Sequence, residues 1–354
     1  MTIQRTAVRP PCDCGELSGT SLIGSTAKPV LILLCMLALA ISVPAQDPSD
    51  LAAKSIEELM DIKVTSVSKK EEKLFKSAAA VYVITQEDIR RSGMSGIPDL
   101  LRTVPGLEVA RIDGTKWAVA SRGFNSRFTN KLLVLIDGRS VYSPDTSGVY
   151  WEALDLPLET IERIEVIRGP GGTLWGANAV NGVINIITKR AVDAQGGLVT
   201  AVGGSEDRFG SVQYGGKAGA QAYFRVYAKY LNTSGLLLDD GGNASDGKNA
   251  AEGGFRLDWQ PSGRDSLGLE GGLYDISLKE RPATVSLVSP LASPGLTRGE
   301  FKGGDLLGRW THAFSGRSDM ALQVYWDRSI HDIHIVGARI DTFDFDFQHH
   351  FGLG

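Results

Sequence analysis

The chain has 354 residues, enough for two domains of ordinary size. Its 37 Lys and Arg residues nearly balance its 41 Asp and Glu residues, so the composition argues against a basic face and against nucleic acid as a partner. The 42 glycines indicate many turns, or places where two backbones come close.

Residues 1–45 have the pattern of an export signal. Basic residues at positions 5, 9 and 28 precede an apolar run over 30–41, and small residues up to Ala45 offer a cleavage point. The run is too short for a membrane-spanning helix. All three cysteines fall in this segment, at 12, 14 and 35, without the spacing of zinc or redox sites. We therefore expect a cleaved signal peptide and an exported chain with no metal site and no cofactor.

Residues 46–77 form a polar, charged segment ahead of the first folded domain. It contains one short β-branched stretch, made of Ile62, Lys63, Val64, Thr65, Ser66 and Val67. An exposed, extended stretch on a flexible tether is suited to pairing with an edge strand of a partner protein. An ordinary linker is the alternative interpretation.

Residues 78–190 predict a small α+β domain. An apolar strand over 79–85 ends at Thr85, which can cap a helix that Gly93 terminates. Further strands are expected at 132–136, 161–167 and 183–188. We interpret the helix charges and the Asp137-Gly138-Arg139 turn that follows the 132–136 strand as solvated faces without a special role.

From residue 196 onward, apolar and polar residues alternate in segments of about ten residues, which is the pattern of an outer-membrane β-barrel. Phe343, Phe345 and Phe347 on one face alternate with Asp344, Asp346 and Gln348 on the other. A soluble β-sandwich also alternates and is the competing interpretation. His331 and His334 are three residues apart, which places them on opposite faces of a strand, and we assign both to a solvated loop or rim rather than to a metal site.

The number of strands bears on the size of the barrel. Residues 196–354 carry about eight strands by their pattern, and an eight-stranded barrel is filled by its own side chains. A barrel that encloses the 78–190 domain needs roughly 22 strands. We therefore expect residues 196–354 to be a partial transmembrane β-barrel, the N-terminal part of a larger one.

A glycine-rich stretch, RGPGGTLWGANAVNG over 168–182, separates two apolar strands and resembles a phosphate-binding loop. The third glycine of the dinucleotide pattern is replaced by Leu174, and the lysine of the P-loop is missing after Gly176. Pro170 also removes a backbone donor. The glycines Gly169, Gly171, Gly172 and Gly176 are better explained by a tight connection between two sheet strands. This argues against a nucleotide-dependent enzyme, and no catalytic arrangement is visible elsewhere.

Several motifs occur together and in a fixed order. They are AVYVITQEDIRRSG (80–93), IPDLLRTVPGLEV (97–109), SRGFNSR (121–127), LLVLIDGRSVY (132–142) and IERIEVIRGPGGTLWGANAVNGVINIITK (161–189). In this combination the chain resembles the plug domain of TonB-dependent outer-membrane receptors, and the alternation after 196 is similar to the start of their barrel. The resemblance implies a plug lodged in a 22-stranded barrel, and energised import of a scarce ligand such as a ferric siderophore, cobalamin or a related metal chelate.

The resemblance also implies roles for particular residues. Residues 62–67 would be the TonB box, which pairs with the periplasmic TonB protein. Arg122 and Arg168 match two plug arginines that the family pairs with barrel glutamates, as a latch. Those glutamates would lie in strands beyond residue 354, so plug packing is expected to depend on them. The remaining partners are outer-membrane lipid and the metal-chelate ligand. The alternative is a non-transporting outer-membrane binding or adhesin-like β-protein that retains a plug-like domain.

Overall fold

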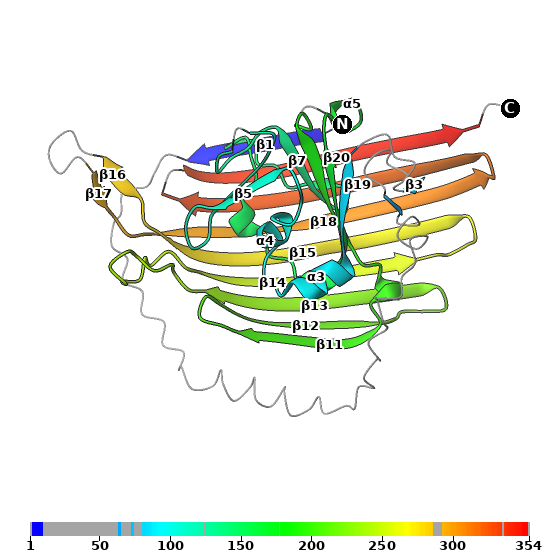
Figure 1. The fold of residues 1–354 in the computed structure, drawn as a ribbon. Helices are drawn as coiled ribbons and strands as arrows, with labels where there is room; N and C mark the ends of the chain where they lie inside the picture. Colours follow the sequence, from blue (N-terminus) through cyan, green and yellow to red (C-terminus); the bar gives the residue numbers. More distant parts are fainter. Residues whose placement is uncertain are drawn as a thin grey trace.

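The computed structural model describes residues 2–9, 63–64, 72–73, 80–123, 125–176, 178–285, 292–334 and 336–352. They form a small α+β domain that lies against one face of a large antiparallel sheet (Figure 1). The expected signal peptide falls mostly outside the described residues.

The small domain is built on a five-stranded mixed sheet of strand order β4-β9-β10-β7-β8. Its strands are β4 (Val81–Thr85), β7 (Leu132–Ile136), β8 (Arg139–Ser140), β9 (Ile161–Arg168) and β10 (Gly182–Thr188). The central strands β9 and β10 are antiparallel, and β10 runs parallel to β7. Ile164, Val166, Ile184 and Ile186 are fully buried, as the apolar runs of these strands require.

Short helices and one hairpin complete the small domain. The hairpin pairs β5 (Leu107–Arg111) with β6 (Trp117–Ser121). The helices are α3 (Gln86–Ser92), α4 (Ile97–Leu101), α5 (Gly172–Trp175) and the 3-10 turns η3 (Trp151–Ala153), η4 (Leu158–Thr160) and η5 (Ala191–Asp193). Thr85 caps α3, and Gly93 ends it at a φ of 67°, as the sequence predicted. Asp88 completes the cap as a capping box. None of the helices in the described ranges is long and apolar enough to cross a membrane.

The large sheet has the strand order β1-β20-β19-β18-β15-β14-β13-β12-β11. Eight of its strands follow residue 196: β11 (Gly196–Gly203), β12 (Asp207–Lys217), β13 (Ala222–Thr233), β14 (Lys248–Trp259), β15 (Asp265–Glu280), β18 (Thr297–Ser315), β19 (Ser318–Ile333) and β20 (Val336–Phe351). The expected number of strands is confirmed, and the sheet is not closed into a barrel. β1 (Thr2–Arg9) lies along the edge of β20. Two further short pairs are β2 (Lys63–Val64) with β3 (Glu72–Lys73), and β16 (Ala283–Val285) with β17 (Ala292–Pro294).

The two faces of the large sheet differ in polarity, and the difference decides between barrel and sandwich. On β13, Val226 and Tyr230 are 44% and 55% exposed, whereas the alternate residues Arg225 and Lys229 are buried. On β20, Phe345 is 50% exposed on the same outer face. A soluble sandwich buries its apolar face, but here the charged face is covered by the small domain and the apolar face is open. This is the arrangement of a barrel wall in lipid.

Candidate functional site

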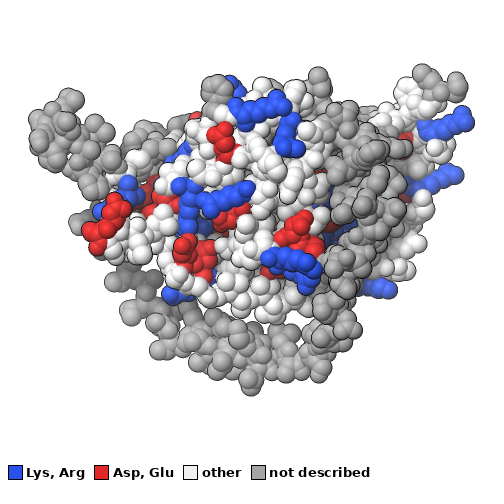
Figure 2. All heavy atoms as spheres, viewed as in Figure 1, with Lys and Arg blue, Asp and Glu red and all other residues white. Residues whose placement is uncertain are grey.

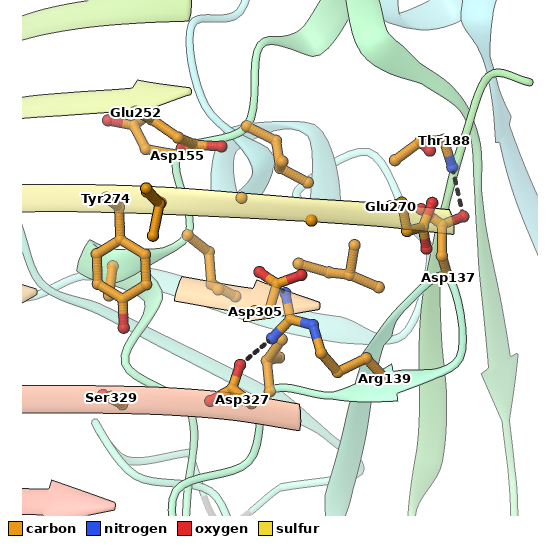
Figure 3. A pocket seen from close by; sticks show the side chains of 18 of the residues that line it. Asp137, Arg139, Asp155, Thr188, Glu252, Glu270, Tyr274, Asp305, Asp327 and Ser329 are labelled. Atoms are coloured by element: carbon orange, nitrogen blue, oxygen red, sulfur yellow. Dashed lines mark hydrogen bonds and ion pairs between the residues drawn. The ribbon is translucent and has the colours of Figure 1, made fainter. Parts of the chain in front are cut away.

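The inner face of the large sheet contacts the small domain mainly through charged groups. Arg139 on β8 reaches two carboxylates on adjacent strands of the large sheet: its Nη2 lies 3.1 Å from Asp305 Oδ1, and its Nη1 lies 2.5 Å from Asp327 Oδ2 (Figure 3). Burial alone would lower the pKa of Arg139, but Asp305 and Asp327 raise it above its ordinary value. The interpretation of this turn as a solvated face is therefore wrong, because the β7–β8 hairpin points at the barrel wall.

Asp137, in the same turn, is also buried rather than solvated. It has a φ of 48°, and its Oδ1 accepts a 2.9 Å hydrogen bond from Thr188 N at the end of β10 (Figure 3). Its backbone carbonyl accepts a 2.7 Å hydrogen bond from Arg309 Nη2 of β18. Arg256 of β14 lies 3.8 Å from the carboxylate and bonds Glu270 of β15 at 3.1 Å. Together with the ion pair between Arg139 and Asp327, these contacts hold the turn to β14, β18 and β19 of the wall.

A third contact surrounds Asp155, which follows η3. Lys229 Nζ of β13 lies 3.0 Å from Asp155 Oδ1, and Lys248 Nζ of β14 lies 3.4 Å from Oδ2. Burial raises the pKa of Asp155, but Lys248 and Lys229 outweigh it, so that its pKa is lowered. Asp155 and Arg139 line one cavity of about 130 Å³ between the two parts (Figure 3). Its other labelled polar residues in Figure 3 are Asp137, Thr188, Glu252, Glu270, Tyr274, Asp305, Asp327 and Ser329.

A fourth contact involves His331 of β19. Its Nε2 lies 2.7 Å from Asp145 Oδ2 and 3.3 Å from the hydroxyl of Tyr150, both in the loop between β8 and η3. The Phe301 ring of β18 stacks on the imidazole with centroids 5.5 Å apart. Burial would raise the pKa of Asp145, but hydrogen bonds from His331 and Ser143 lower it to about 2.

His331 is buried on the inner face of β19, whereas His334 lies in the connection after the strand and is exposed. The expectation that both are solvated is wrong for His331, because the small domain covers the inner face of β19. Among the described residues, no group of three or more His, Cys, Asp or Glu is arranged to hold a metal ion.

The two arginines singled out by resemblance lie close together near the glycine-rich loop. Arg122 has a φ of 61°, is exposed, and places its Nη2 3.4 Å from the carbonyl oxygen of Arg168. Arg168 Nη1 donates to the carbonyl oxygen of Pro105 at 2.9 Å. Within the described part of the chain, neither makes an ion pair with a carboxylate. Their role as a latch stays a prediction.

The glycine-rich loop connects two strands that are antiparallel neighbours, as expected. After β9, the backbone turns at Gly169 (φ 148°), passes Pro170 and Gly171, forms α5 from Gly172, and turns again at Gly176 (φ 88°). Such φ values favour glycine.

The predicted TonB box is only partly within the described residues. Lys63 and Val64 form β2, in register with Lys73 and Glu72. Ile62, Thr65, Ser66 and Val67 lie outside the described residues, so the assignment stays a prediction.

Charges on the outer surface of the small domain pair locally. On the face seen in Figure 2, Lys and Arg residues lie beside Asp and Glu residues rather than gathering by sign. On α3, Arg90 Nη2 lies 3.0 Å from Glu87 Oε2, and both side chains are in contact with solvent. For this helix, the interpretation of its charges as a solvated face is confirmed.

Sequence reasoning missed the inward-facing carboxylates of the wall. A signal was present: Asp305 and Asp327 stand on the polar face of strands whose other face is apolar. In a barrel that face meets the lumen, so each carboxylate there needs a cation or a donor from whatever fills it.

Comparison with known proteins relates the small domain to one family. Residues 73–183 match the family model described as the TonB-dependent receptor plug domain. The chain is 34% identical over 173 residues to the vitamin B12 transporter BtuB of Vibrio vulnificus, a match that covers 48% of this chain and 27% of that protein. It is 33% identical over 165 residues to the ferric enterobactin receptor PirA of Pseudomonas aeruginosa, covering 43% and 21%. The chain thus spans about a quarter of the length of these relatives.

Solved structures show the same fold. The ferripyoverdine receptor of the Pseudomonas aeruginosa outer membrane superimposes with a TM-score of 0.61 at 17% identity, over 76% of this chain and 36% of that one. The ferric-catecholate import receptor Fiu of E. coli K12 gives a TM-score of 0.58 at 17% identity, over 73% and 40%.

Proposed function

We propose that the chain is the N-terminal part of a TonB-dependent receptor that serves the energised uptake of a scarce ligand across the outer membrane, because residues 73–183 match the plug domain of that family. The ligand class is a ferric siderophore, cobalamin or a related metal chelate, as the names of the relatives suggest. The relatives' names describe transporters and receptors, and we propose no catalytic activity.

The observation that carries this proposal is the polarity of the plug–barrel interface. The plug is held by ion pairs such as Arg139–Asp305 and Lys229–Asp155, while the apolar face of the wall points away from it. Charged contacts beside a cavity of about 130 Å³ can exchange for water when the plug moves, whereas a continuous apolar interface could not do so at small cost. Such an interface suits a plug that must rearrange to let a ligand pass.

The same proposal assigns the remaining partners. The exposed apolar face of β11–β20 would contact outer-membrane lipid after export of the chain by its signal peptide. The periplasmic TonB protein would pair with residues 62–67 by strand addition.

Uptake measurements test the proposal. A strain that lacks the receptor gene is complemented with it and supplied with radiolabelled cyanocobalamin, ferric enterobactin or ferripyoverdine. We expect accumulation of at least one of them that stops when the proton gradient is collapsed. If a ligand binds to these cells but never accumulates, the non-transporting alternative is correct; if the panel neither binds nor accumulates, the proposed ligand class is wrong.

The TonB-box assignment makes a separate prediction. Deletion of residues 62–67 should abolish uptake, because the partner loses the strand that it pairs with, while surface binding of the same ligand stays unchanged. Deletion of six residues further upstream, 48–53, is the length-matched control and should preserve uptake. Undiminished uptake after loss of 62–67 would show that the box lies elsewhere.

A further inference from the structure

The tip of the β5–β6 hairpin is buried, which is unusual for a turn between two strands. Gly114, Thr115 and Lys116 are all buried, although the hairpin is two-stranded and stands outside the main plug sheet. The covering groups come from the barrel, at the strand ends that carry the longer connections, such as 234–247 between β13 and β14. We call residues 114–116 the hairpin tip.

Two buried carboxylates of the barrel hold the hairpin tip. Asp246, 4% exposed, accepts a 2.8 Å hydrogen bond from Gly114 N through its Oδ2. Glu280, at the end of β15 and 1% exposed, lies 2.9 Å from Lys116 Nζ. Glu280 also accepts a hydrogen bond of 2.9 Å from His334 N, in the connection that follows β19. Lys116 Nζ also lies 3.0 Å from Asp113 Oδ2 within the hairpin, so this ammonium is shared between a plug carboxylate and a barrel carboxylate.

The contact at Asp246 leaves no room for adjustment. A Cβ on Gly114 would lie 2.6 Å from the carbonyl oxygen of Asp246, closer than any real Cβ contact. On its other side, Asp246 Oδ1 accepts Leu236 N at 2.8 Å and thereby ties the two ends of the β13–β14 loop together. One side chain therefore fixes both the shape of the barrel loop and the position of the plug hairpin.

The far end of the hairpin contacts the glycine-rich loop of the plug. Asn181 Nδ2 donates to the carbonyl oxygen of Ser121, the last residue of β6, at 3.1 Å. Arg168 Nη1 donates to the carbonyl oxygen of Pro105, just before β5, at 2.9 Å. The hairpin thus spans from the barrel loop to the loop at residues 168–182.

From this geometry we propose that Asp246 is a positioning residue that couples the β13–β14 loop to the plug. A displacement of that loop withdraws Asp246 from Gly114 N, removes one of the two buried barrel carboxylates that hold the β5–β6 hairpin, and thereby loosens residues 168–182 at its base. The loop exposes Leu237 and Asp239 to solvent on its outer side, so a ligand that contacts these residues would act on the plug through Asp246. The proposal rests on the proposed receptor function only for this last step.

Hydrogen exchange followed by mass spectrometry tests the coupling on the receptor isolated from outer membranes, without ligand and without TonB. In Asp246→Ala, amides of residues 107–121 and 168–182 should exchange about tenfold faster than in the parent, the effect of losing roughly one net hydrogen bond. Asp239→Ala changes an exposed carboxylate of the same loop and is the matched control, expected to leave both segments unchanged.

Gly114→Ala approaches the same contact from the plug side. It should accelerate the same segments, and the double variant should exchange no faster than either single variant, because both break one contact. A purely structural role of Asp246 within its own loop would accelerate residues 234–247 alone, and that result, or additive effects in the double variant, would overturn the proposal. Because no ligand is used, an exchange result that overturns the coupling does not contradict the uptake proposal. Likewise, a negative uptake result does not contradict the coupling.

Discussion

Arg139 relieves a conflict that the barrel creates. Asp305 and Asp327 stand directly opposite each other on β18 and β19, and carboxylates in that relation repel. The guanidinium of Arg139 lies within ion-pair distance of both, so the plug supplies the charge that the wall lacks. A guanidinium suits this place better than an ammonium, because its separate N–H groups reach two acceptors at once.

Replacement of Arg139 by Gln should therefore loosen the plug. It leaves two opposed carboxylates without a cation, and we expect the free energy of plug unfolding to fall by about 2 to 4 kcal/mol. This is somewhat less than for a fully buried pair, since the three side chains are 12% to 21% exposed. Protease protection of the plug across a urea series measures the loss. The matched control, Arg91→Gln on the solvated helix α3, should change it by less than about 0.5 kcal/mol.

The lowered pKa of Asp145 predicts that the contact between the 143–150 segment and the wall weakens in acid. Its pKa is lowered from the ordinary value of 3.8 to about 2 in the folded state. The ionised carboxylate therefore stabilises the folded state above pH 3.8, and this stabilisation is lost as the pH falls toward 2. A full shift of this size corresponds to about 2 kcal/mol, and solvent screening of the partly buried carboxylate reduces the expected contribution to roughly 1 kcal/mol. Hydrogen exchange of residues 143–150, expressed relative to the intrinsic rate of an unprotected amide at the same pH, should rise between pH 4 and pH 2. In Asp145→Asn this rise should be absent, and a rise equal to that of the parent would show that another group is responsible.

Among the elements, the connection from β9 to β10 depends more on Gly182, where β10 begins, than on Gly172, where α5 begins. A Cβ at Gly182 would lie 2.4 Å from the carbonyl oxygen of Ile167 on the adjacent strand. Around Gly172, the nearest atom to such a Cβ is a carbonyl oxygen at 3.9 Å. The glycines of this loop thus serve different purposes, and only the backbone geometry distinguishes them.

We expect Gly182→Ala to destabilise the plug by at least about 2 kcal/mol, because the backbones of two central strands must separate. Gly172→Ala, ten residues earlier, should be neutral or slightly stabilising, because alanine favours the helical conformation that this residue adopts. Plug unfolding in urea compares the two. Equal effects of the two changes would refute this account of the loop.

At the scale of the whole molecule, the large sheet has its apolar face outside. Phe343, Phe345 and Phe347 are each at least half exposed, while Asp344 and Asp346 on the same strand face inward. An outer face of this kind is stable only against lipid or another apolar surface.

A charge on that face should therefore block insertion. Phe345→Arg is expected to cost about 2 to 4 kcal/mol of barrel stability if the residue lies near the membrane midplane, and less near an interface. Gln348→Arg places the same charge on the inward face and should be tolerated. Folding into lipid vesicles, followed by the shift in gel mobility between heated and unheated samples, distinguishes the two variants.

Much of the fold could be predicted because it rests on local patterns. The capping box at Thr85, the apolar strands around the glycine-rich loop, and the alternation on β13 and β20 are each contained in a few consecutive residues. The candidate site could not be predicted in the same way. His331 and Asp145 are 186 residues apart, and Arg139 and Asp327 are 188 apart, so no local pattern connects them.

By itself, the sequence determined the class of the protein: an α+β plug followed by amphipathic strands. The periodicity of apolar residues and the residues that favour turns are each contained in short stretches of the chain. Only the tertiary structure decided which charges are buried. Arg139, Asp137 and His331 look like ordinary surface residues in sequence, and they are buried because the plug lies on the inner face of the wall. The physical reason is that the burial of a charge depends on what is placed over it, and that depends on contacts between distant parts of the chain.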